Sequence, residues 1–178
     1  GGDAENAELR DMTWRFWWSV GLSAPVVVLG MTTFAPPVIS AWVQLVFATP
    51  VVVWLGWPIF IRFWDSLVRM SPNMFTLTGL GIGIAYIYSV VAVLAPGIFP
   101  EIFRTEGGLP PIYFEVAAVI MALVLLGQVL ELRARSSTNA AIRGLLGLAP
   151  KTARLVRADG SEEDVSLASV KIGNHLRI

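Results

Sequence analysis

Four stretches of this 178-residue chain are candidates for helices that cross a lipid bilayer. A helix needs about 20 mainly apolar residues to span the hydrocarbon core. Composition agrees, because 55% of the residues are hydrophobic and 15% are charged, whereas soluble domains are usually about 45–50% apolar and about 25% charged. The sequence therefore predicts an all-α polytopic membrane bundle with four spans, at residues 13–35, 41–60, 72–95 and 113–132.

Charge and cysteine content limit the chemistry that this chain can carry. The formal net charge is zero, so no nucleic-acid partner is expected. The chain has no cysteine and a single histidine, His175, which excludes disulfides, thiolate metal sites and multi-histidine sites within it. The polar segment 1–12 lacks a basic start and is not typical of a cleaved signal peptide.

The distribution of Lys and Arg predicts how the spans are oriented, because short cytoplasmic loops are enriched in these residues. The loop at residues 97–111 contains Arg104 beside two glutamates. The other basic residues lie before or at the start of the first span, after the second or after the fourth, among them Arg10, Arg15, Arg62, Arg69, Arg133, Arg135, Arg143 and Lys151. Both termini of this multi-pass chain are therefore expected to lie in the cytoplasm. The membrane in question is expected to be the cell (inner) membrane.

The second span is expected to bend near its end. Gly56-Trp57-Pro58 breaks the helix there, because proline lacks an N–H and clashes with the preceding turn. Residues 57–69 then form an amphipathic pattern, in which Arg62 and Arg69 lie away from the apolar face and are expected to be exposed. The apolar residues recur at helical spacing: Trp57, Phe60, Ile61, Trp64 and Leu67. This pattern predicts a platform helix in the cytoplasmic interface, and a frayed helix end is the alternative.

The third span has a clear start and a packing signal. Ser71 is expected to be its N-cap, with Pro72 at the first helical position. Gly79 and Gly83, four residues apart, predict close approach of another helix.

The end of the chain changes character. The fourth helix is expected to continue into water over residues 133–149 and to stop at Ala149-Pro150. Strands are predicted at 152–157, 163–167 and 175–178, with Asp159-Gly160 as a hairpin turn. Residues 150–178 are too few for an independent β domain, so they are interpreted as the start of a truncated β-rich domain.

Two carboxylates in the fourth span, Glu115 and Glu131, are the strongest functional signal, since a charge in a bilayer costs about 2.5–3.5 kcal/mol. They are sixteen residues apart, which corresponds to about 24 Å of helix and about 160° of rotation. They therefore belong to two sites. Met74 begins the third span at the depth of Glu131, and a thioether beside a carboxylate suits a soft ion such as Cu(I). Alternatively, Met74 fills the core, Glu131 forms a salt bridge and Glu115 reaches the outer surface.

Four segments in this order resemble the copper(I)-transporting P-type ATPases: GWPIFIRFWDSL, SPNMFTLTGLGIGIAYIYSVVA, YFEVAAVIMALVLLGQVLELRAR and IRGLLGLAPKTARLVR. The resemblance implies that the first two spans are the class-specific helices MA and MB. The next two spans would be M1 and M2, and residues 150–178 would begin the actuator domain. The lipid bilayer and the remaining domains of the same pump would be the chain's partners.

The resemblance also implies site roles. Met74 and Glu131 match the residues that receive Cu(I) transiently at the cytoplasmic side, and Glu115 matches the exit-pathway glutamate. The platform, with its kink at Gly56 and Pro58 and with Arg62 and Arg69, would dock a copper chaperone or a metal-binding domain. The family often has two glycines at this kink, where this chain has Leu55-Gly56.

Several motifs of that family do not occur in this sequence, namely TGE, CPC, DKTGT and an N-terminal CxxC. This segment alone is therefore not expected to hydrolyse ATP, and ATP and Mg(II) would belong to other domains. A non-enzymatic four-helix membrane module, a scaffold or regulator, is the alternative function. The sequence does not separate Cu(I) from Ag(I), because the two ions share soft-ligand chemistry.

Overall fold

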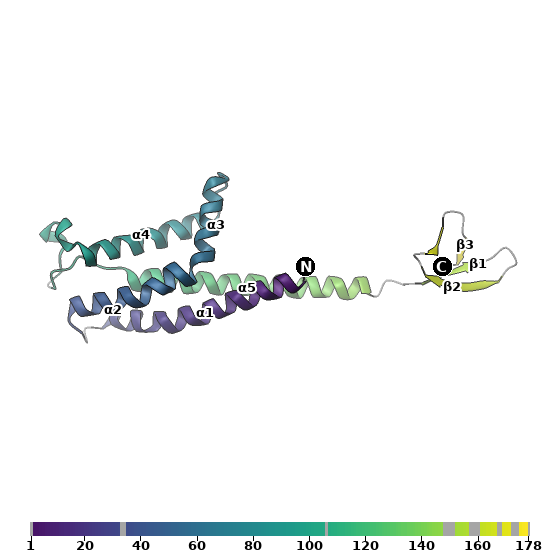
Figure 1. Cartoon of the computed structure of the whole chain (residues 1–178), viewed down its shortest axis with the longest axis horizontal. Coiled ribbons are helices and arrows are strands. Elements are labelled where there is room, and N and C mark those ends of the chain that lie inside the picture. The colour runs from purple at the N-terminus through teal and green to yellow at the C-terminus, as the bar shows by residue number, and fades with distance from the viewer. Residues whose placement is uncertain are drawn as a thin grey trace. The chain divides into compact units, whose positions relative to one another are not determined.

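A computed structural model describes residues 2–32, 35–105, 107–147, 152–156, 161–166, 169–171 and 175–177. The chain divides into two compact units, residues 1–134 and residues 135–178. The first is helical and the second contains the strands (Figure 1).

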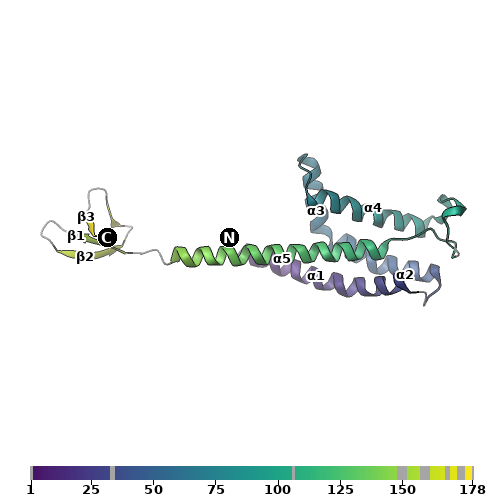
Figure 2. The same ribbon diagram turned by 180° about the vertical axis from the view of Figure 1, so that it is seen from behind.

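Helices build the first unit, and several run side by side in both views (Figures 1 and 2). The helix α3 turns away from the direction of α2 and packs against α4. A π-helical segment precedes α3, and two 3-10 turns follow α4, at Pro96–Ile98 and Glu101–Phe103. The bounds are Gly2–Met31 for α1, Pro37–Thr49 for α2, Pro50–Leu55 for the π-helical segment, Trp57–Val68 for α3, Met74–Leu94 for α4 and Phe114–Gly147 for α5.

Among the described residues, three helical stretches are long and apolar enough to span a membrane: Pro37–Leu55, Met74–Leu94 and Phe114–Ile142. The second predicted span thus begins at Pro37 rather than residue 41 and ends at Leu55 rather than residue 60, because the helix breaks at Gly56. The first predicted span, residues 13–35, which falls mainly in α1, stays a prediction. Its hydropathy is reduced by Arg15 and by tryptophans, a residue type that prefers the interface to the hydrocarbon core.

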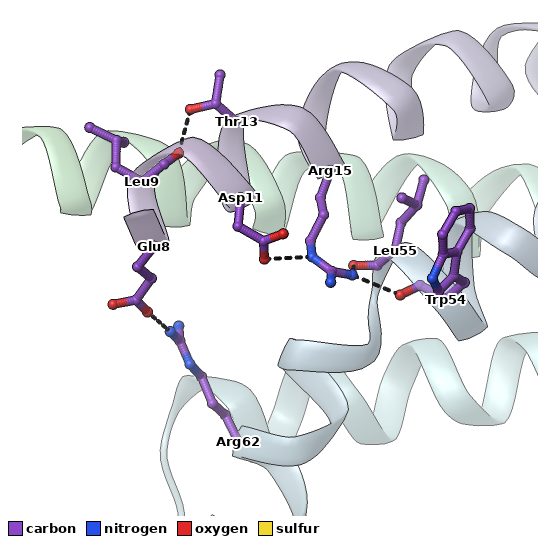
Figure 3. Close-up of polar contacts among 8 residues, drawn as sticks. All are labelled: Glu8, Leu9, Asp11, Thr13, Arg15, Trp54, Leu55 and Arg62. Carbon is purple, nitrogen blue, oxygen red and sulfur yellow. Dashed lines mark hydrogen bonds and ion pairs between the residues drawn. The ribbon is translucent and has the colours of Figure 1, made fainter. Parts of the chain in front are cut away.

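The segment predicted as a polar tail, residues 1–12, is helical from Gly2 onward and belongs to α1. Its inner side joins the core, since Met12 is buried and Leu9 packs against the buried cluster. The extra helical turns carry Glu8 and Asp11 to the vicinity of α3 and Arg15 (Figure 3).

The core of the first unit forms around one face of α5. Buried apolar residues recur along this helix at intervals of three or four, as expected for a helix that packs along one stripe. They are Phe114, Ala117, Ala118, Met121, Ala122, Leu125, Val129 and Leu132. Buried residues of the other helices complete the same cluster, among them Val26, Ala41, Val52, Ile59 and Ile82. The first half of α5 is therefore the central helix of this unit.

The predicted N-cap of α4 is wrong. The helix begins at Met74 with Asn73 as its N-cap, not Ser71, and Asn73 Oδ1 accepts from the backbone N–H of Phe75 at 2.9 Å. Thr76 Oγ1 in turn accepts from the Asn73 N–H at 2.9 Å, which completes a reciprocal capping box. Asparagine caps at least as well as serine, and the cap fixes the position of Met74.

Close packing at Gly79 is confirmed. A Cβ at this position would lie 2.7 Å from both Cβ and Cγ of Phe63 on α3, whereas a Cβ at Gly83 would make only an ordinary contact with Phe60. We expect Gly79→Ala to lower the stability of the chain by about 1–3 kcal/mol, as overpacking does. Gly81→Ala, which meets no atom within 4 Å, should be neutral or stabilising by up to about 1 kcal/mol through helix propensity.

Thermal unfolding of the detergent-solubilised chain, followed by circular dichroism, compares the two variants. Equal midpoints for Gly79→Ala and Gly81→Ala would contradict close packing of α4 on α3.

The second unit contains a three-stranded antiparallel sheet in the order β2-β1-β3. The strands are β1 Thr152–Val156, β2 Glu162–Ser166 and β3 His175–Arg177, close to the predicted positions. The predicted turn at Asp159-Gly160 and the helix stop at Ala149-Pro150 lie outside the described residues. Arg154 of β1 donates to Asp164 of β2 at 3.0 Å, and this hydrogen bond, with the charge attraction, lowers the pKa of the Asp164 carboxyl.

Candidate metal-entrance site and platform

The kink before the platform is built by a widened helical turn. The Gly56 N–H donates to the Val51 carbonyl at 3.0 Å, five residues back, so the end of the second span is π-helical. Gly56 has an ordinary φ of −78°, so its conformation does not require glycine. Close approach does, because a Cβ there would lie 2.5 Å from the Val52 carbonyl oxygen and 2.3 Å from Met121 Cε.

Arg15 of α1 lies far from the kink in the sequence but donates hydrogen bonds to its backbone (Figure 3). In a regular α-helix the N–H of residue 58 would bond to the Trp54 carbonyl, but Pro58 has no N–H. The Leu55 carbonyl also lacks its usual donor, because the Ile59 N–H donates to the Gly56 carbonyl at 2.9 Å instead. Arg15 Nη1 donates instead to the Trp54 carbonyl at 3.0 Å and to the Leu55 carbonyl at 3.4 Å.

The platform α3 has the predicted amphipathic character. Ile59 and Ser66 are buried, whereas Trp57, Ile61 and Trp64 are among the exposed apolar residues of this helix. The exposed face is rich in tryptophan, which favours the membrane interface. The helix ends at Val68, and Met70 follows with a positive φ of 50°, which lets the chain turn toward α4.

The two platform arginines differ in their surroundings. Arg69 is 73% exposed and pairs with Asp65 one turn earlier, at 2.9 Å. The Arg62 side chain is 31% exposed, and its Nη2 donates to Glu8 of α1 at 2.7 Å (Figure 3). The expectation that both charges are exposed is therefore wrong for Arg62, because Glu8 lies in a helix that the sequence did not predict.

Arg62 also contacts the two helices that carry the candidate metal ligands. Its Nη1 donates to Gln128 Oε1 on α5. Its guanidinium lies over the ring of Phe75 on α4, 5.3 Å from the ring centroid. Arg62 thus joins α3 to α1, α4 and α5 through one planar cation.

Glu131 is held at one end of this network. Gln128 Nε2 donates to Glu131 Oε2 at 3.4 Å, as the spacing of three residues on one helix predicts. Met74 is 58% exposed and precedes Phe75 at the start of α4. The structure connects Met74 and Glu131 through Phe75, Arg62 and Gln128. That Met74 and Glu131 share a depth in the membrane stays a prediction.

Glu115 lies near the other end of α5, beside a cavity of about 610 Å³. A Cβ at Gly30 of α1 would lie 3.1 Å from Glu115 Cγ, so glycine makes room for the carboxylate. Gln44 and Ser40 of α2 also line the cavity, and Gln44 Nε2 donates to Ser40 Oγ at 3.1 Å. The two glutamates therefore belong to separate sites, as the helical spacing predicts.

The described part of the chain contains no group of three or more acidic, histidine or cysteine residues that could hold a metal ion. The candidate ligands at the entrance are instead one thioether and one carboxylate, Met74 and Glu131. Weak, exposed ligands of this kind can capture an ion that is then passed on, and thioethers favour Cu(I) over hard cations.

Sequence reasoning missed two residues of this region, Glu8 and Arg15. Arg15 was used only as an orientation signal. Pro58 was the available clue, since a proline in the first turn of a helix leaves the carbonyl four residues earlier without its usual donor. The partner of that carbonyl is 39 residues away, and spacing along the chain does not reveal it.

These features define a class of protein: a polytopic membrane protein with a kinked amphipathic helix and a polar network joining that helix to a candidate ion path. Comparison with models of known protein families finds no match. The chain is 53% identical over 176 residues to a copper-exporting P-type ATPase of Legionella pneumophila, covering 96% of this chain and 24% of that relative.

Two further relatives agree. A copper-transporting P-type ATPase of Rhizobium leguminosarum is 50% identical over 184 residues, covering 99% of this chain and 22% of the relative. A silver exporting P-type ATPase of Salmonella typhimurium is 52% identical over 179 residues, covering 96% and 22%. The chain belongs to this family of copper- and silver-exporting P-type ATPases, and it spans less than a quarter of the length of these relatives.

Proposed function

We propose that this chain is the part of an ATP-driven Cu(I) exporter that receives copper in the cytoplasm and forms part of its path to the far side. The observation that carries the proposal is the identity of 50–53% to copper and silver exporters over nearly the whole chain. Cu(I) is the transported substrate. ATP and Mg(II) would act on other domains of the same pump.

Met74 and Glu131 receive the ion in this proposal. The Met74 thioether provides a soft donor and the Glu131 carboxylate provides a negative charge, a combination that suits Cu(I). Both side chains are exposed, which supports transient capture rather than tight storage. Glu115, beside its cavity, would receive the ion on the exit side.

The platform serves the donor of copper. The tryptophan-rich face of α3 would lie in the cytoplasmic interface of the inner membrane, with α1 as a fourth span and both termini in the cytoplasm. The exposed Arg69 would attract an acidic copper chaperone or metal-binding domain. Arg62, which is paired with Glu8, would contribute less to this attraction.

The roles of Met74 and Glu131 are tested in the full-length pump by Met74→Leu and Glu131→Gln. Each variant should lower Cu(I)-stimulated ATP hydrolysis at limiting Cu(I) by about 10-fold or more, since even indirect partners of a metal ligand are worth that much. Met70→Leu and Glu101→Gln are matched controls at exposed positions outside the proposed path, and they should behave as wild type. Wild-type turnover in both test variants would refute the assignment.

Ag(I) is a second candidate substrate, because one relative at 52% identity is named a silver exporter. Both ions favour the thioether of Met74. Measuring ATP hydrolysis of the same pump against each free ion distinguishes them: a higher kcat/KM for Ag(I) would assign silver as the preferred substrate.

A further inference from the structure

The geometry points to Gln128 as a positioning residue: it holds the Glu131 carboxylate and ties it to Arg62 of the platform. This inference rests on the proposed role of Glu131 in receiving Cu(I). It adds a residue that does not itself touch the ion but determines where the carboxylate lies when the ion arrives.

The chemistry of the three side chains fixes how the Gln128 amide is oriented. A guanidinium can only donate hydrogen bonds, so the amide oxygen must face Arg62. A carboxylate can only accept, so the amide nitrogen must face Glu131. The structure has this arrangement, with Gln128 Oε1 at Arg62 Nη1 and Gln128 Nε2 at 3.4 Å from Glu131 Oε2. An amide can link a donor to an acceptor in this way, and a methionine or leucine cannot.

Burial makes the amide a fixed part of the structure. Gln128 is 2% exposed, although it lies in a helix with exposed neighbours at positions 127, 130 and 131. A buried amide is costly unless it is hydrogen-bonded, and Arg62 and Glu131 provide both partners. Gln128 therefore has few alternative rotamers, and its nitrogen stays aimed at the carboxylate.

Arg62 is itself held by two further contacts, which makes it a firm anchor. Glu8 of α1 accepts from Nη2 at 2.7 Å, and the ring of Phe75 on α4 lies under the guanidinium at 5.3 Å. Through Arg62, Gln128 therefore fixes the position of Glu131 relative to the platform and to the start of α4, where Met74 lies. Loss of Gln128 should leave both ligands in place but uncouple their positions.

The test is Gln128→Met in the full-length pump, because methionine has similar length and no strong hydrogen-bonding group. We expect the KM for free Cu(I) to rise about 10-fold while kcat at saturating Cu(I) stays within about twofold, as for loss of a partner that orients a metal ligand. Leu130→Met, an exposed position on the same helix, is the control and should keep the wild-type KM.

A second variant separates positioning from packing. Gln128→Glu retains an acceptor for Arg62 but, when ionised, cannot donate to Glu131, so it should raise the KM as Gln128→Met does. Its KM decides the question if Gln128→Met does not yield folded pump. Wild-type KM in the Gln128 variants, or a fall in kcat with unchanged KM, would overturn the inference. Failure of the proposed function is distinguishable, because it requires wild-type turnover in Met74→Leu and Glu131→Gln.

Discussion

Replacing Gly56 by alanine should destabilise the chain by about 1–3 kcal/mol, the usual cost of forcing an extra carbon into a packed site. The added Cβ would lie 2.5 Å from the Val52 carbonyl oxygen and within 2.7 Å of Met121 Cε and Sδ. The methionine could move aside, since it is flexible. The Val52 carbonyl cannot, because it is part of the backbone of the π-helical segment.

Gly127→Ala is the matched control for this experiment. Gly127 lies within α5, and a Cβ there would meet no atom within 4 Å. This variant should therefore be neutral or up to about 1 kcal/mol more stable, because alanine favours the helix. Thermal unfolding of the solubilised chain gives the two midpoints, and the expected shifts have opposite signs. A Gly56→Ala midpoint at or above that of Gly127→Ala would show that the kink tolerates a side chain.

Replacing Arg15 by methionine should cost about 1.5–3 kcal/mol, the range for hydrogen bonds made by charged groups. The substitution removes the donor to the Trp54 and Leu55 carbonyls while keeping much of the length of the side chain. Pro58 cannot supply a replacement, because it has no N–H. The end of the second span should consequently unfold at a lower temperature than the rest of the first unit.

Arg10→Met provides the comparison, since it removes the same charge five residues earlier at an exposed position. Hydrogen exchange followed by mass spectrometry would report protection of residues 54–60 in both variants. We expect faster exchange in Arg15→Met and wild-type exchange in Arg10→Met. Equal protection in the two would mean that the carbonyls do not depend on Arg15.

Much of the fold was predictable because its causes are local. The break at Gly56, the amphipathic α3 and the close contact at Gly79 follow from proline chemistry, helical periodicity and small-residue spacing. The three short strands follow from alternation of residue types. The separation of Glu115 from Glu131 required only the rise and rotation of a helix.

The parts that were missed depend on contacts between distant residues. Arg62 meets Glu8 across 54 positions and Gln128 across 66, and no periodicity links such pairs. Residues 2–12 are helical where Leu9 and Met12 pack against the core of the first unit. Such tertiary packing stabilises helices in proteins more than intrinsic propensity does. Predicting Ser71 instead of Asn73 as the N-cap was a boundary error of two residues, since both residue types cap well.

The π-helical segment Pro50–Leu55 also bears on how this region tolerates changes in chain length. A helix that gains one residue can keep its faces aligned by widening a single turn, and a π-helical turn has that form. Deleting one residue from this segment could be absorbed by a return to α-helical hydrogen bonding. An insertion within α3, in contrast, would rotate every later side chain by about 100° and turn the tryptophan face away. Homologues that differ by one residue before Gly56 can therefore present the same platform face.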